Sequence, residues 1–96
     1  MKVIIDIKNP LSQYYKYNGL TFEVKDLMNS SVGVLLRDGN LNQTDFHFNE
    51  ILIVDFQQEV KSCLKFNFTF KLKKLQNYSR IKGIHIDNLI LKYYES

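Results

Sequence analysis

KFNFTFKLKK, residues 65 to 74, places a large apolar side chain at every second position from Phe66 to Leu72. A period of two is typical of a β-strand that buries one face and exposes the other. Aromatic side chains favour strands as well. The segment therefore predicts a long strand with its phenylalanines inward and with Lys65, Lys71 and Lys73 outward.

The residues after this segment are expected to return as a second strand. Residues 76 to 79, QNYS, are typical of a turn, and residues 81 to 94 alternate again. Their apolar positions are Ile84 and Ile86, followed one residue out of phase by Leu89, Leu91 and Tyr93. A β-bulge near Asp87 and Asn88 would absorb the extra residue. The expected product is a C-terminal β-hairpin.

The first half of the chain shows the same period of two in four shorter segments. The expected inward faces are Val3, Ile5 and Ile7; Leu20, Phe22 and Val24; Val32, Val34 and Leu36; and Phe46 and Phe48. Asn9-Pro10, Asn18-Gly19 and Asp38-Gly39-Asn40 are typical turn sequences that separate these segments. Four strands are therefore predicted before residue 49.

Residues 49 to 63 leave two interpretations open. A single helical turn at Asn49-Glu50 would break the chain before a fifth strand, because residues 51 to 54 are mostly β-branched. Alternatively, Asn49 caps a helix with one apolar face, formed by Leu52, Phe56, Val60 and Cys63. Under the first interpretation, residues 57 to 63 could still form one short helix.

The chain is expected to be one all-β domain of 96 residues, with a barrel over residues 1 to 56. Residues 57 to 96 would add a short helical link and the basic hairpin. The strand spacing of residues 1 to 56, with its long early loop, tight later turns and break before the last strand, resembles a small Src-homology-3-like barrel. Barrels of this kind recur in small proteins of bacteriophages and mobile elements, most of which bind a partner. The resemblance therefore implies a binding protein of that kind. No ALYDY-like peptide-groove sequence is present, so binding of proline-rich peptides is not implied.

Charge is distributed unevenly along the chain, whose net charge is +3. Residues 60 to 86 contain no acidic side chain and hold seven basic ones, namely Lys61, Lys65, Lys71, Lys73, Lys74, Arg80 and Lys82. Such a surface would attract phosphates or an acidic protein patch. Alternatively, the lysines are solvated and prevent edge-to-edge aggregation. Lysine outnumbers arginine eleven to two, which argues against reading of nucleic-acid bases.

Tyrosines gather in the first long loop, at Tyr14, Tyr15 and Tyr17. A tyrosine ring with its polar hydroxyl suits a protein interface or stacking on bases. Alternatively, two of the rings fold back over one end of the barrel. The alternation within this loop favours at least one exposed ring.

Groups suited to catalysis or metal binding are sparse. Asp45 with His47, and His85 with Asp87, each place an imidazole and a carboxylate two residues apart, yet neither has further ligands nearby in the sequence. Cys63 is the one cysteine and is expected to be buried or inert. No phosphate-loop or paired-cysteine motif is present, so no enzyme, cofactor or metal site is expected.

The expected function is that of a non-catalytic binding protein of a phage or mobile element. It would inhibit a host protein or nucleoprotein complex by covering a surface, as anti-CRISPR and other anti-defence proteins do. The expected binding residues are Lys65, Lys71, Lys73, Lys74, Arg80, Lys82, Tyr14, Tyr15 and Tyr17. A nucleic-acid-binding module and a self-associating virion subunit are the alternatives. No apolar run spans a bilayer, so a cytoplasmic location without a membrane partner is expected.

Overall fold

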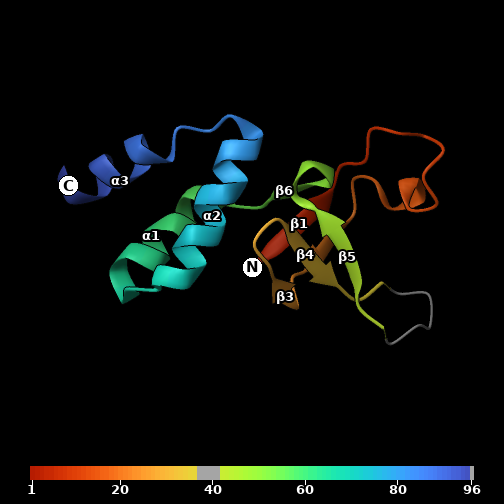
Figure 1. Ribbon diagram of the computed structural model, residues 1–96, viewed down its shortest axis with the longest axis horizontal. Coiled ribbons are helices and arrows are strands. Elements are labelled where there is room, and N and C mark those ends of the chain that lie inside the picture. Colours follow the sequence, from red (N-terminus) through yellow and green to blue (C-terminus); the bar gives the residue numbers. More distant parts are fainter. Residues whose placement is uncertain (37–41, 96) are drawn as a thin grey trace. The chain divides into compact units, whose positions relative to one another are not determined.

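A computed structural model describes residues 1 to 36 and 42 to 95 (Figure 1). The chain divides into two compact units, Met1–Val54 and Asp55–Ser96. The first unit consists of strands and short 3-10 turns, and the second consists of α-helices. The prediction of an all-β fold is therefore wrong, and the protein is of mixed α/β class. The turn expected at residues 38 to 40 lies outside the described residues.

Two antiparallel sheets make up the first unit. One has the strand order β2-β1-β6 and the other has the order β3-β4-β5. The strands are β1 (Lys2–Ile5), β2 (Thr21–Glu23), β3 (Asp26–Leu27), β4 (Ser31–Val34), β5 (Thr44–His47) and β6 (Ile51–Ile53). The register pairs Val3 of the central strand β1 with Phe22 on one side and with Ile53 on the other.

The core of this unit follows the period of two. Its buried apolar side chains are Val3, Ile5, Ile7, Val32, Val34, Leu36, Phe46, Phe48, Ile51 and Ile53. The expected inward faces of the first, third and fourth strands are therefore confirmed. In the second expected strand, Phe22 is half-buried and Leu20 remains 51% exposed. A Cβ atom at Gly33 in β4 would meet the exposed side chain of Gln43, which would have to move aside.

The predicted break between β5 and β6 is confirmed as the 3-10 turn η2 (Phe48–Glu50). His47 caps this turn, because its Nδ1 accepts a hydrogen bond from the Asn49 N–H at 3.2 Å. The Glu50 carboxylate in return accepts from the His47 N–H at 2.9 Å. These two bonds form a capping box. Asn49 therefore does not cap a long helix, and the alternative that placed a helix start there is wrong.

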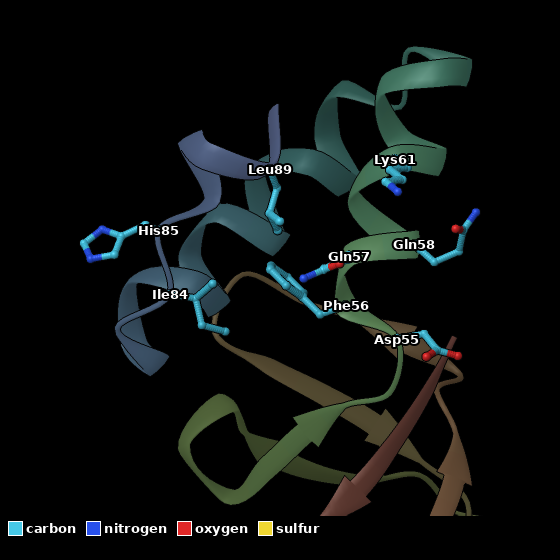
Figure 2. Close-up of a pocket in the computed structure, with 8 residues that line it drawn as sticks. All are labelled: Asp55, Phe56, Gln57, Gln58, Lys61, Ile84, His85 and Leu89. Atoms are coloured by element: carbon cyan, nitrogen blue, oxygen red, sulfur yellow. The ribbon is translucent and has the colours of Figure 1, made fainter. Parts of the chain in front are cut away.

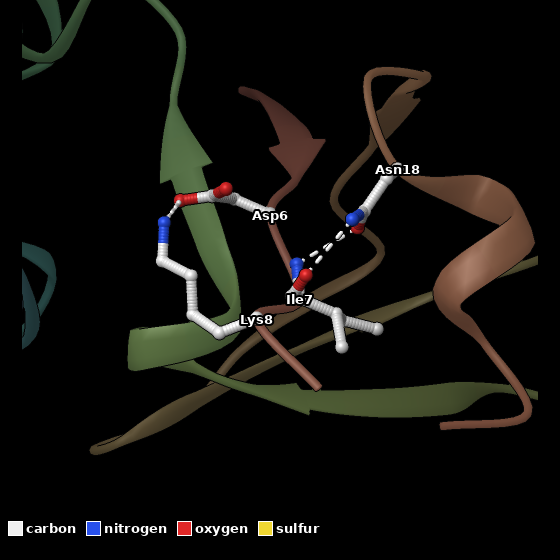
Figure 3. A network of polar contacts seen from close by, with 4 residues as sticks. All are labelled: Asp6, Ile7, Lys8 and Asn18. Atoms are coloured by element: carbon white, nitrogen blue, oxygen red, sulfur yellow. Dashed lines mark hydrogen bonds and ion pairs between the residues drawn. The ribbon is translucent and has the colours of Figure 1, made fainter. Parts of the chain in front are cut away.

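The long loop between β1 and β2 is closed by the side chain of Asn18 (Figure 3). Its Oδ1 accepts from the Ile7 N–H and its Nδ2 donates to the Ile7 carbonyl, both at 2.8 Å. The amide thus pairs with the backbone of Ile7 as a neighbouring strand would. An exposed ion pair between Lys8 Nζ and Asp6 Oδ2, at 2.9 Å, lies beside it.

The second unit contains α1 (Phe56–Phe66), α2 (Thr69–Lys82) and α3 (Ile86–Glu95). The expected C-terminal β-hairpin is therefore wrong, and the short helix expected near residues 57 to 63 is longer than predicted. Asn67 ends α1 and Gly83 ends α2, each with a left-handed backbone conformation, with φ of 58° and 70°. Helix α1 packs against both α2 and α3.

The spacing of buried residues explains why these segments are helical. In α2, Leu75, Tyr78 and Ser79 are buried, a spacing of three and four residues that one helix face provides. The expected turn at residues 76 to 79 lies inside this helix. In α3 the four least exposed side chains follow the same spacing, at Ile86, Leu89, Ile90 and Tyr93. The phase shift that predicted a β-bulge is therefore the period of a helix.

Candidate binding surface

Residues 65 to 70, where α1 ends and α2 begins, are all exposed. Phe66 is 58% exposed, Phe68 49% and Phe70 79%, so the prediction that these side chains face a core is wrong. Their spacing matches that of a strand with one buried face, which is why the sequence predicts them to point inward. In the structure Phe66 ends α1, Phe68 lies in the link, and Phe70 lies in the first turn of α2. We name this surface, with Lys65 and Lys73, the aromatic tip.

Lysine ammonium groups lie against the rings of the aromatic tip. Lys65 Nζ is 5.3 Å from the centroid of the Phe66 ring, and Lys73 Nζ is 5.9 Å from that of Phe70. Phe66 and Phe68 contact each other, with centroids 5.8 Å apart and ring planes inclined by 31°. The tip thus combines apolar surface with positive charge at one exposed place.

Lys71 is less exposed than Lys65 and Lys73. Its Nζ lies 2.8 Å from Glu59 Oε2, and both side chains are mostly covered, at 32% and 21% exposure. The ion pair joins the first turn of α2 to α1 and so fixes the backbone that carries the aromatic tip.

The other predicted basic residues divide between two sides of α2. Lys73 and Arg80 are seven residues apart, which is two helical turns, and both are exposed. Lys82 is half-buried, with its Nζ 5.8 Å from the centroid of the buried Tyr78 ring. Lys74 is also half-buried. The six predicted residues therefore do not form one continuous basic face.

The loop that carries Tyr14, Tyr15 and Tyr17 lies in the first unit, and two of its three tyrosine rings pack against that unit. Tyr14 contacts the buried Phe46 edge to face at 5.3 Å, and Tyr17 contacts Phe22 at 6.1 Å. Tyr15 is 42% exposed. Two rings thus fold back onto the unit, and of the three tyrosines of this loop Tyr15 is the one left exposed to a partner.

The two histidine and aspartate pairs have separate surroundings. Asp45 accepts a hydrogen bond from Gln43 Nε2 at 2.9 Å, while His47 caps η2. His85 and Asp87 both line a hollow of about 490 Å³ together with Arg80. Within the described residues, no group of three or more His, Cys, Asp or Glu side chains is placed to hold a metal ion.

A second hollow, of about 480 Å³, lies in the helical unit (Figure 2). Its lining residues are Asp55, Phe56, Gln57, Gln58, Lys61, Ile84, His85 and Leu89. Figure 2 shows the His85 imidazole pointing away from Phe56 and Leu89, while the Gln57 side chain lies beside Phe56. The lining therefore combines apolar and polar side chains.

Cys63 is buried in the helical unit. Burial raises the pKa of its thiol, which nearby Lys71 lowers and Glu59 raises by smaller amounts. Since the reactive form of cysteine is the thiolate, this thiol is held in its unreactive form. A role in packing fits the residue better than a role as a nucleophile.

Comparison of the chain with protein-family models, with curated proteins and with solved structures finds no match. Among the helices of the described residues, none is long and apolar enough to cross a bilayer.

Proposed function

We propose that this chain is a non-catalytic binding protein that attaches to an anionic partner through the aromatic tip of its helical unit. The observation that carries the proposal is the exposure of Phe66, Phe68 and Phe70 beside Lys65 and Lys73. Apolar groups that gather at one exposed place commonly mark an interaction site. Burying a phenylalanine side chain fully is worth about 1.5 to 3 kcal/mol, so three rings offer a substantial driving force.

The charge of the surrounding segment supports an anionic partner. Residues 60 to 86 hold no acidic side chain, and the nearest preceding one, Glu59, is paired with Lys71 at 2.8 Å. Lys65, Lys73 and Arg80 are exposed. Such a distribution raises the association rate with an anion and makes binding depend on salt.

The first unit would serve as the scaffold. We propose that residues 1 to 54 form a small Src-homology-3-like barrel, and the strand orders β2-β1-β6 and β3-β4-β5 with η2 before the last strand support that proposal. Such a fold is used for many unrelated functions, so it adds no partner of its own.

The role of a phage or mobile-element inhibitor of a host protein stays a prediction from the sequence, as does a cytoplasmic location. A nucleic-acid-binding module would use the same positive charge. A self-associating virion subunit was predicted to use the edge of a C-terminal strand, and residues 86 to 95 form a helix instead.

The proposal is tested by titrating the protein with fluorescein-labelled heparin, a generic polyanion, at low and at physiological salt. We expect salt-dependent binding that weakens about tenfold in Phe70→Ser/Lys73→Ser, since central aromatic and cationic residues contribute most to such contacts. The matched control is Leu11→Ser/Lys25→Ser, which removes one exposed apolar side chain and one exposed lysine from the first unit. Equal loss in both variants would contradict the proposal, because binding would then follow net charge alone.

A further inference from the structure

We propose that the anionic partner is a lipid membrane, and that the aromatic tip inserts its rings among the headgroups of an anionic leaflet. This inference rests on the proposed function and names its partner. Rings would enter the boundary between headgroups and acyl chains, and the lysines beside them would bind lipid phosphates. Such attachment needs no membrane-spanning helix. The expectation of no membrane partner considered only segments that cross a bilayer, so it does not bear on attachment at the surface.

The exposure of the tip favours a bilayer over a strand of nucleic acid. Six consecutive residues, 65 to 70, are exposed where α1 ends and α2 begins, so their side chains reach into solvent. Single-stranded nucleic acids are usually held in a charged groove with aromatic platforms. A bilayer interface, in contrast, accepts a protruding apolar group directly.

The side-chain chemistry points the same way. Phenylalanine has no polar atom with which to pair a base, and Lys65 and Lys73 lie 5.3 and 5.9 Å from the ring centroids of Phe66 and Phe70. Lysine acts as a point charge on a flexible stem, which suits mobile lipid phosphates. Each lysine near an anionic surface adds electrostatic attraction to it.

Three backbone N–H groups in the link between α1 and α2 are paired internally, which favours contact with lipid. The N–H groups of Asn67 and Phe68 both donate to the Cys63 carbonyl, the latter at 3.0 Å. The Thr69 N–H donates to the Asn67 carbonyl at 2.9 Å. Because unpaired amides are costly away from water, these bonds lower the cost of placing the link between α1 and α2 at the interface.

The chain contains no tryptophan, so one introduced residue reports on its own surroundings. Phe70→Trp places the reporter at the most exposed ring of the tip, and Leu11→Trp places a matched reporter at a 92% exposed position of the first unit. Each variant is mixed with vesicles of phosphatidylcholine alone and with vesicles containing about one quarter phosphatidylserine.

We expect the emission of Phe70→Trp to shift to shorter wavelength with the phosphatidylserine vesicles, and to be quenched by brominated acyl chains. Leu11→Trp should show neither change. Added salt should weaken the effect, and Phe66→Ser introduced into Phe70→Trp should reduce vesicle affinity about fivefold.

Labelled heparin and a labelled single-stranded oligonucleotide are titrated in parallel. Binding to either polyanion without any change in Phe70→Trp emission on vesicles would overturn the membrane inference and leave the proposed function standing. Binding to none of the probes would overturn both. Vesicle binding that shifts Leu11→Trp as much as Phe70→Trp would also overturn the inference, because the tip would then have no special part in it.

Discussion

Two phenylalanines of the first unit and three of the second are placed in opposite ways. In the first unit Phe46 and Phe48 are 1% and 0% exposed, and Tyr14 packs against Phe46. In the second unit Phe66, Phe68 and Phe70 are exposed, with a lysine beside the first ring and another beside the last. Buried rings stabilise a fold, whereas rings held at the surface are available to a partner.

Charge differs between the same two regions. Residues 1 to 54 hold five basic and six acidic side chains, while residues 55 to 96 hold eight basic and four acidic ones, none of the acids lying within residues 60 to 86. The first unit therefore has the features of a scaffold and the helical unit those of an attachment surface.

The largest expected effect on stability comes from truncating a buried ring of the first unit, and truncating an exposed ring of the second unit is its control. Phe46→Ala should lower the free energy of unfolding by about 3 to 5 kcal/mol, because it leaves a cavity in a packed core. Phe70→Ala should change it by less than about 0.5 kcal/mol, because that ring is 79% exposed. Urea unfolding followed by circular dichroism measures both. Similar losses in the two variants would show that Phe70 is part of a core.

A smaller effect is expected at the loop of the scaffold unit. Asn18→Ala removes two hydrogen bonds to Ile7, each 2.8 Å long, and should cost about 1 to 3 kcal/mol. Asn9→Ala is the control from the same loop, since its side chain accepts one exposed hydrogen bond, from the Leu11 N–H. Neither variant should change heparin affinity, measured as above. A large loss of affinity in Asn18→Ala would place the binding surface in the first unit.

The ion pair beneath the tip should have an effect of about 1 kcal/mol. Lys71→Glu sets a second carboxylate against Glu59, and like charges in a partly covered site repel. Lys73→Glu, two residues along on the solvent face, should leave stability unchanged while weakening heparin binding. The double variant Glu59→Lys/Lys71→Glu should recover the stability lost in Lys71→Glu. If Lys73→Glu were the more destabilising of the two, the assigned faces of α2 would be reversed.

The smallest expected effect is the titration of Cys63 in the core of the helical unit. Burial raises the pKa of the thiol above its ordinary value of 9.0, so the folded state holds this proton more tightly than the unfolded chain does. Its contribution to stability is therefore complete below pH 9.0 and is lost as the pH rises through the raised pKa. The stability difference between the protein and Cys63→Ala should shrink as the pH rises above 9.0. A constant difference would show that the thiol is accessible to solvent.

The first unit could be predicted from the sequence because its strands bury one face each. Val3 and Ile5 alternate with more exposed residues, as does Phe46 between Asp45 and His47, and local turns separate the segments. The break at residues 49 and 50 was also visible, since the alternation falters there. The local alternation could not predict the partial exposure of Leu20, because that exposure depends on how the rest of the unit packs.

The second unit was predicted wrongly because exposed side chains can repeat by chance. Phe66, Phe68 and Phe70 have the spacing of a strand, but they sit on either side of a helix boundary that Asn67 creates. The spacing of Phe56, Val60 and Cys63 was a correct sign of a helix, which the sequence offered as one of two interpretations. The spacing of residues 86, 89, 90 and 93 also fits a helix. The lysines of the site were foreseen from charge, whereas the phenylalanines beside them required knowledge of burial.

The most direct test of the exposed tip is acrylamide quenching of Phe70→Trp in the free protein. The account predicts emission close to that of tryptophan in water and quenching nearly as strong as that of the free amino acid, because this position is 79% exposed. Blue-shifted emission that acrylamide hardly quenches would contradict it. Phe70 would then face a core, as the alternation of KFNFTFKLKK first indicates, and the helical unit would lack the surface on which its proposed function depends.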